Sequence, residues 1–214
     1  NRIKANKIIS IPTGIDESIF NPESFNREEC RKKLTINDSE IAIGILAVLR
    51  QFKRHDLFLK MAKSLIKKYP GKRLVFIIAG NGPQKENIEK IINDLNLAEN
   101  VKMVGHINNV PEFLCAIDIL VLSSDSKEGV PQSVMQGLFM NKPVVSSDSG
   151  STRDLFNHNN FQLIQKGSIE ALINGVSIYL DNMNEVSSRK YMMENFSSSV
   201  MVKKIITSYE KILE

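Results

Sequence analysis

Acidic and glycine residues follow an apolar run in the middle of this sequence. Glu128 comes shortly after the run Ile119–Leu122 and directly before Gly129, Val130 and Pro131. A short apolar run bounded by turn residues is typical of a strand buried on both faces. A carboxylate accepts hydrogen bonds from hydroxyls, and free N–H groups at a helix start donate to anionic oxygens. The turn therefore predicts a site for a hydroxyl-rich, partly anionic ligand, with a solvated loop glutamate as the alternative.

A basic pair follows another apolar run. Arg50 and Lys53 lie just after residues 40–49, at the start of a predicted helix. Arginine offers a planar fork and lysine a mobile point charge, so both can face a diphosphate. Positive charge at a helix N-terminus opposes the helix dipole, which favours a bound anion there. The alternative is a basic, solvated loop.

Two glycine turns also follow apolar runs. Gly80 opens the first, G-N-G-P, which lacks the third glycine of the dinucleotide fingerprint. We interpret it as a tight turn that needs φ > 0, although Gly80 also allows a ligand to approach closely. The second turn contains Gly105, His106 and Ile107.

Strand-like and helix-like segments alternate along the whole chain. This alternation predicts an α/β fold with a doubly wound parallel sheet of about six strands. In such sheets, ligands bind in the crevice at the carboxyl ends of the strands, where all these turns should meet. The expected strands are 40–49, 73–80, 101–105, 119–122, one that opens at 143–145, and 161–164, with a further short strand at 7–12. The expected helices include 27–34, 54–69, 110–116, 152–157, 168–180, 184–195 and 198–213.

Composition excludes several classes of protein. The chain has 214 residues, 42% hydrophobic and 24% charged, which suits one α/β domain with its own core. No apolar run approaches the ~20 residues of a membrane span, and no signal peptide is visible. Asn1 is not a start methionine, so we expect a preceding portion of the protein.

The cysteines, histidines and charges show no metal or nucleic-acid motif. Cys30 and Cys115 form no C-x-x-C, which fits a reducing compartment, and the three histidines are scattered. We therefore expect no metal site. The net charge of +4 is spread over helices and interleaved with acids, so we expect a solvated surface and no nucleic-acid partner, with a mild attraction to a membrane surface left open.

The stretch from Glu128 onward resembles a known family. Glu128-Gly129-x-Pro131, then a helix, a short loop and Pro143-Val144-Val145, is similar to the signature of retaining GT-B glycosyltransferases of the glycosyl transferases group 1, or glycosyltransferase family 4-like, type. The resemblance covers most of the chain. It implies one nucleotide-sugar-binding domain over 1–214, the Rossmann-like C-terminal half of a GT-B fold. Residues 1–16 would be an N-terminal segment, and helices in 184–214 would cross to an N-terminal domain.

The resemblance also implies roles for the residues at the predicted edge. Lys53 and Arg50 would neutralise the diphosphate, and Glu128 would orient the sugar. The family carries a second glutamate where this chain has Gln136, which would bind ribose without a charge. Many relatives carry their arginine where this chain has Val48, so Lys53 is the stronger candidate.

Further binding positions follow from the same resemblance. The chain at Gly129, Val130 and Pro131 would contact the distal phosphate or sugar. Gly80 would let the donor approach, and main-chain groups at His106 and Ile107 would grip the base.

The implied activity is transfer of a hexose from a UDP-, GDP- or ADP-sugar to a glycan or lipid-linked acceptor. It would need no cofactor, in the cytoplasm or at the inner membrane face of a bacterium, and this piece alone would transfer sugar poorly or not at all. The alternatives are a non-catalytic nucleotide-sugar-binding module, with Gln136 marking lost catalysis, and a GT-B-like epimerase.

Overall fold

A single parallel sheet is the frame on which the other elements are placed. The computed structural model describes residues 8–125, 129–155, 161–182 and 187–213. Within them, the strands run parallel in the order β3-β2-β1-β4-β5-β6. This confirms the predicted doubly wound α/β fold. The strands are β1 (Glu40–Leu46), β2 (Arg73–Ala79), β3 (Val101–Gly105), β4 (Ile119–Leu122), β5 (Val144–Ser147) and β6 (Phe161–Ile164).

The strands are continuously apolar because both faces of the sheet are buried. Successive side chains of a strand point to opposite faces. In β4, Leu120 and Leu122 pack into one core, while Ile119 and Val121 pack into the other. A strand covered on only one side would alternate apolar with polar residues instead.

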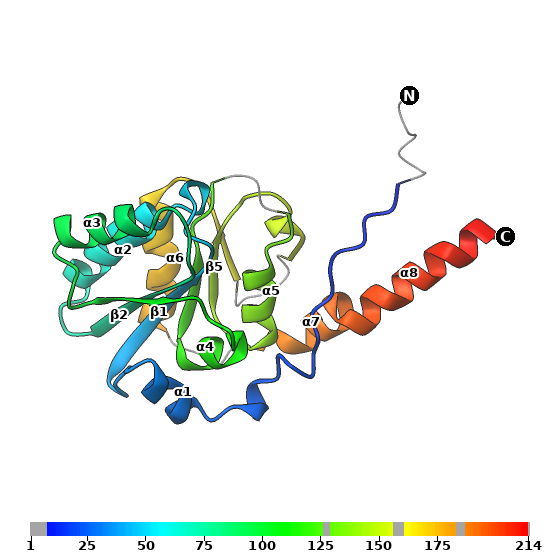
Figure 1. Ribbon diagram of the computed structural model, residues 1–214, viewed down its shortest axis with the longest axis horizontal. Helices are drawn as coiled ribbons and strands as arrows, with labels where there is room; N and C mark the ends of the chain where they lie inside the picture. The colour runs from blue at the N-terminus through cyan, green and yellow to red at the C-terminus, as the bar shows by residue number, and fades with distance from the viewer. Residues whose placement is uncertain (1–7, 126–128, 156–160, 183–186, 214) are drawn as a thin grey trace.

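Helices cover the two faces in separate layers (Figure 1). One layer holds α2, α3 and α6, and the other holds α1, α4, α5 and α7. Tight contact between α5 and the sheet depends on Gly137, because a Cβ there would lie 2.5 Å from Leu120 Cδ2. The helices are α1 (Arg27–Lys33), α2 (His55–Lys68), α3 (Lys85–Asp94), α4 (Val110–Ala116), α5 (Gln132–Phe139), α6 (Ile169–Asp181), α7 (Arg189–Phe196) and α8 (Ser198–Leu213).

Two predicted elements need correction, and a third lies partly outside the described residues. Residues 8–12 form no strand, so the strand predicted over 7–12 is wrong, and Lys7 itself lies outside the described residues. Ile8 and Ile9 are exposed, so nothing pairs with this apolar run. The short helix predicted over 152–157 is a 3-10 helix over Thr152–Leu155, and residues 156–157 lie outside the described part. The helix predicted over 184–195 is α7, whose first described helical residue is Arg189.

A segment near the start of the described chain is hydrogen-bonded to the helices near its end. Ile15 N–H donates to Phe196 O at 2.9 Å, and Ser198 N–H donates to Ile15 O at 2.8 Å. The Arg189 guanidinium donates to the carbonyls of Glu17 and Phe20. These bonds fix residues 15–20 against α7 and the start of α8, while the rest of α8 projects from the domain (Figure 1).

A buried cation ties α1 to the amino ends of β1 and β4. The Arg31 side chain donates to the carbonyls of Asn37 and Glu40, each at 2.6 Å, and to Asp118 Oδ2 at 3.3 Å. The same Asp118 oxygen accepts the Ala42 N–H at 2.7 Å. Because an unpaired buried charge is strongly unfavourable, this network fixes the two central strands to one another.

Candidate functional site

A cavity of about 650 Å³ opens at the carboxyl edge of the sheet. It lies where the strand order turns from β1 to β4, which is the position at which doubly wound sheets bind ligands. We call it the edge cavity. Its lining residues come from the ends of β1, β2 and β3, the turn before α2, and the starts of α4 and α5: Leu46, Ala47, Val48, Lys53, Ala79, Gly80, Asn81, His106, Ile107, Val110, Val130, Pro131, Gln132, Ser133 and Gln136.

The structure thus brings seven of the ten predicted site residues together. They are Lys53, Gly80, His106, Ile107, Val130, Pro131 and Gln136. Sequence reasoning missed Asn81, Gln132 and Ser133 as lining side chains. Asn81 belongs to the predicted glycine turn, and Gln132 and Ser133 begin the helix after Pro131. Only their positions next to predicted site residues, and not their residue types, could have indicated that they line the cavity.

The wall formed by β1, β2 and β3 is made of backbone in close contact. Ala47 N–H donates to Ala79 O at 3.0 Å, and Gly80 N–H donates to Gly105 O at 2.7 Å. Gly80 has φ +142°, and a Cβ there would lie 2.0 Å from Ala47 O. The interpretation of Gly80 as a glycine required by backbone conformation is therefore correct.

The start of α5 forms the wall of the edge cavity opposite the ends of β1, β2 and β3, and its first N–H groups are potential hydrogen-bond donors. Pro131 is the N-cap residue and its side chain makes no capping bond. The first N–H groups of a helix have no partner within the helix, and the helix dipole makes them favourable toward anions. Gln132 and Ser133 line the cavity at this end, so the wall suits a phosphate or a sugar hydroxyl.

Lys53 is the only lysine or arginine among the described residues that line the edge cavity. It ends the 3-10 turn Gln51–Lys53, and its ammonium lies 5.4 Å from the centroid of the Phe52 ring. The Ser123 hydroxyl, at the end of β4, lies 2.8 Å from Lys53 O. The neighbouring strand thereby fixes the backbone that carries the lysine.

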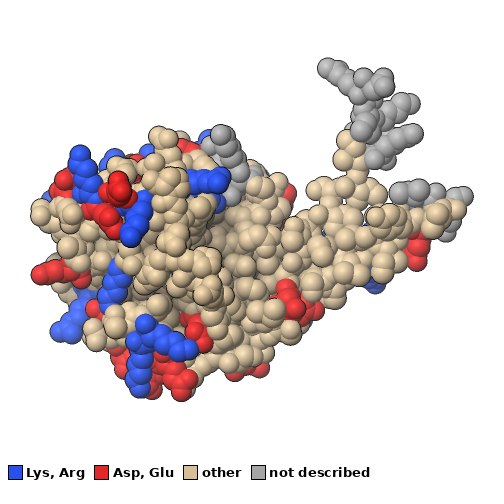
Figure 2. Space-filling view, viewed as in Figure 1, with Lys and Arg blue, Asp and Glu red and all other residues tan. Residues whose placement is uncertain are grey.

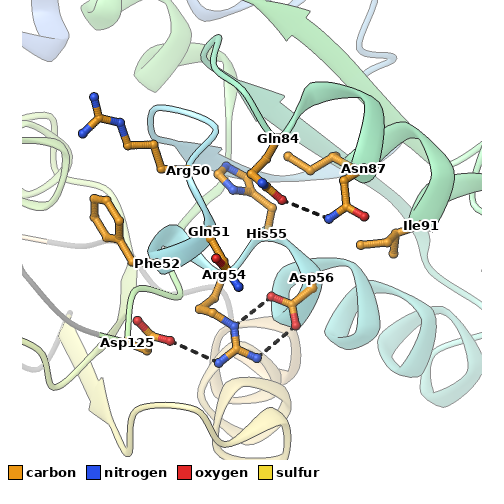
Figure 3. Close-up of a pocket in the computed structure, with 11 residues that line it drawn as sticks. Arg50, Gln51, Phe52, Arg54, His55, Asp56, Gln84, Asn87, Ile91 and Asp125 are labelled. Carbon is orange, nitrogen blue, oxygen red and sulfur yellow. Dashed lines mark hydrogen bonds and ion pairs between the residues drawn. The ribbon is translucent and has the colours of Figure 1, made fainter.

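Arg50 lies on the other side of the turn. Arg50 directly precedes the 3-10 turn Gln51–Lys53, and its backbone is extended, with φ −115° and ψ 153°. Arg50 lines a second cavity of about 560 Å³, between the starts of α2 and α3 (Figure 3). The structure therefore separates the two predicted cations.

Besides Arg50, two further predicted residues are not placed in the edge cavity. Glu128 lies outside the described residues, so its role stays a prediction. Gly129 is exposed, and a Cβ built on it would meet nothing within 4 Å. Val130 is thus the first residue after Glu128 that the structure places at the cavity.

The second cavity has a buried histidine in its lining. His55 is 3% exposed, and neither ring nitrogen has a hydrogen-bond partner among the described residues (Figure 3). Burial, with a smaller contribution from the nearby Lys53 charge and against the opposing charge of Asp56, lowers the pKa of His55 to about 4. His55 is therefore neutral at physiological pH.

The described residues contain no cluster of three or more His, Cys, Asp or Glu side chains that could hold a metal ion. In the same part of the chain, no helix is long and apolar enough to cross a lipid bilayer.

Residues 26–197 match the sequence profile of the family described as "Glycosyl transferases group 1". The chain belongs to this family. A UDP-Gal:alpha-D-GlcNAc-diphosphoundecaprenol alpha-1,3-galactosyltransferase of Escherichia coli is 26% identical over 210 residues, 95% of this chain and 54% of that protein. The lipopolysaccharide core biosynthesis mannosyltransferase LpsB of Rhizobium meliloti is 21% identical over 94% of this chain and 60% of its own length. This group 1 chain thus spans little more than half of each relative.

Solved structures show the same fold. A glycosyltransferase from Rickettsia africae superposes with a TM-score of 0.89 at 18% identity, over 99% of this chain and 59% of that one. Anabaena Alr3699/HepE in complex with UDP-glucose gives a TM-score of 0.85 at 18% identity, over 97% of this chain and 58% of that one. The group 1 chain therefore has the architecture of one part of a GT-B glycosyltransferase.

Gly80→Ala should destabilise the group 1 domain. The new Cβ would meet the Ala47 carbonyl, which is backbone and cannot move aside, so we expect a loss of about 2–3 kcal/mol in the free energy of unfolding. Urea unfolding measures it. Gly71→Ala is the matched control, because a Cβ there meets nothing within 4 Å and the variant should match the wild type. Equal stability of the two variants would contradict the close approach.

His55 should make stability depend on pH. Its pKa is lowered from 6.5 to about 4 in the fold, so the unfolded chain binds the extra proton first. The contribution of the neutral ring is complete above pH 6.5, is lost progressively as the pH falls toward 4, and is gone below that. The free energy of unfolding of the wild type should therefore fall relative to that of His55→Leu as the pH drops through that window. Parallel pH curves would rule the shift out.

Proposed function

We propose that this chain is the donor-binding half of a retaining glycosyltransferase. The whole protein would move a hexose from a nucleoside-diphosphate sugar to a glycan or lipid-linked acceptor, without a cofactor or metal. The observation that carries the proposal is the edge cavity, in which a lysine, an uncapped helix start and close backbone turns meet at the switch point of the sheet. Among the solved relatives of this fold, Alr3699/HepE was crystallised with UDP-glucose.

In this proposal Lys53 stabilises the diphosphate leaving group. Negative charge on the bridging oxygen grows as the sugar–phosphate bond breaks, so a fixed cation binds the transition state more strongly than the ground state. N–H groups at the start of α5, next to Gln132 and Ser133, donate to the distal phosphate or to sugar hydroxyls.

Gln136 and Glu128 take the remaining polar roles. Gln136 lines the edge cavity one turn into α5, and its amide can hydrogen-bond a ribose hydroxyl without adding charge. Glu128 would accept hydrogen bonds from the sugar and orient the ring below its anomeric carbon. The base would lie against the main chain at His106 and Ile107 and would be uracil, guanine or adenine.

An N-terminal domain would bind the acceptor and close the edge cavity. The projecting α8 carries exposed apolar side chains, with Val202 48%, Ile206 52% and Tyr209 66% exposed. Figure 2 shows few charged side chains on this projection. An apolar helix face that no described residue covers fits a segment that packs on further protein, and we propose that α8 crosses to that domain.

Lys53→Ala should weaken binding of the free nucleoside diphosphate by about tenfold or more, because a charge-assisted contact to phosphate is lost. Arg50→Ala is the matched control, since Arg50 lines the second cavity, and its effect should stay below about threefold. Titration calorimetry with whichever of UDP, GDP and ADP raises the melting temperature most gives both constants. Equal losses would contradict the placement of the two cations, and no binding at all would end the proposal.

Glu128→Gln in the full-length protein should lower turnover by about 10²–10³-fold while nucleotide affinity stays within a fewfold of the wild type. The carboxylate would act on the sugar in the transition state rather than on the diphosphate. Release of nucleoside diphosphate from the sugar nucleotide in the presence of acceptor measures turnover. Near-normal turnover would remove Glu128 from the site.

A further inference from the structure

The turn that carries Lys53 contains a residue in a strained conformation. Arg54 follows Lys53 with φ 54° and ψ 47°, in the left-handed helical region. A non-glycine residue there is disfavoured by about 1–2 kcal/mol, because its Cβ crowds the following carbonyl. Such strain persists only where the surroundings determine the conformation.

The Arg54 side chain is held by two acids (Figure 3). Its Nε and Nη2 donate to the two oxygens of Asp56 at 2.9 and 3.0 Å, and Nη1 donates to Asp125 Oδ2 at 3.3 Å. The hydrogen bonds that the Arg54 guanidinium donates to Asp56 raise the pKa of Arg54. Burial alone would raise the pKa of Asp56, but the Arg54 guanidinium lowers it overall.

These ion pairs do not explain the strain by stability alone. Arg54, Asp56 and Asp125 are 27%, 28% and 36% exposed, and partly exposed pairs contribute only about 0–1 kcal/mol. The ion pairs therefore contribute no more free energy than the left-handed conformation of Arg54 costs. A glycine would satisfy the backbone at this position without strain. The ion pairs of Arg54 therefore add little net stability beyond offsetting the backbone strain.

The end of β4 holds the same turn through its backbone. The buried Ser123 hydroxyl lies 2.8 Å from Lys53 O and 3.0 Å from Arg54 O. Asp125 N–H donates to Phe52 O at 3.0 Å. The Asp125 N–H thus holds the Phe52 carbonyl, the single Ser123 O–H is shared between the carbonyls of Lys53 and Arg54, and Asp125 also holds Arg54 through its side chain.

We propose that Ser123, Arg54 and Asp125 are positioning residues that hold the Lys53 turn against the loop after β4 and so set the lysine toward the diphosphate. The inference rests on the proposed role of Lys53 in donor binding. These contacts join the turn that carries Lys53, on one wall of the edge cavity, to the residues directly after the carboxyl end of β4. None of the three residues lines that cavity, so they act through Lys53.

Arg54→Gly separates positioning from stability. It removes the guanidinium but also the strain, so the melting temperature of the full protein should stay within a few degrees of the wild type. The dissociation constant for the nucleoside diphosphate should rise about tenfold, because the lysine loses its fixed position. Lys32→Ala is the matched control, since it removes an exposed ion pair with Glu28, neither of which lines the edge cavity, and should leave affinity unchanged.

Ser123→Ala tests the backbone arm independently of Arg54. It should also weaken nucleotide binding about tenfold, because the bond to the Lys53 carbonyl is lost. Ser146→Ala is its matched control: Ser146 is also buried in the sheet, and its hydroxyl donates to a local carbonyl at 3.3 Å. A fall in melting temperature that is equal in the two serine variants, without a difference in affinity, would show a structural role only.

A double-mutant cycle decides whether the effect passes through the lysine. In a Lys53→Ala background, Arg54→Gly and Ser123→Ala should cause almost no further loss of affinity, because the group that they position is absent. Full additivity would overturn the inference. If Lys53→Ala alone leaves affinity unchanged, the proposed function fails. If it weakens affinity but Arg54→Gly and Ser123→Ala do not, only the positioning role fails.

Discussion

The pairing of β1 with β4 is the constraint on which the candidate site depends. The register joins only Ile43 with Ile119 and Gly44 with Leu120, yet this short pair is where the sheet reverses its strand order. Polar contacts fix it at both ends. At the amino ends, Asp118 accepts from the Ala42 N–H and from Arg31. At the carboxyl ends, Ser123 holds the turn that carries Lys53. The cavity wall is therefore a consequence of how two central strands are joined.

The apolar pattern of the sequence predicts the sheet well, because strands buried on both faces must be apolar throughout. The observed bounds of β3, α4, β6 and α8 match the prediction. The strand prediction over 7–12 is wrong for a different reason. An apolar run forms a strand only where a neighbouring strand pairs with its backbone hydrogen-bonding groups. The predicted first strand also ends early, at Leu46, although Ala47 and Leu49 still donate to the end of β2 and the turn after it.

The site was predictable to the level of the strand ends and no further. Strand topology brings Lys53, Gly80, His106 and Gln136 to one edge, and that follows from the α/β alternation. The side of a turn on which a cation lies does not follow, because it is decided by the backbone angles of Arg50. The left-handed conformation of Arg54 was equally hidden, since no glycine marks the position. Contacts from β4, distant in sequence, determine it.

The two predicted cations lie in different cavities, so the edge cavity has less positive charge than the sequence predicts. Val48 lines the edge cavity where many relatives would place an arginine, and Arg50 lines the second cavity. In the proposed function, anion binding in the described part of the edge cavity would therefore rest on one lysine and on backbone N–H groups at a helix start. A point charge on a flexible stem stabilises a developing charge only if its backbone is fixed, because reorganisation would otherwise oppose the gain. A site with fewer cations would thus depend more strongly on the rigidity of the turn that carries the remaining one, and in our proposal the contacts of Arg54 and Ser123 supply that rigidity.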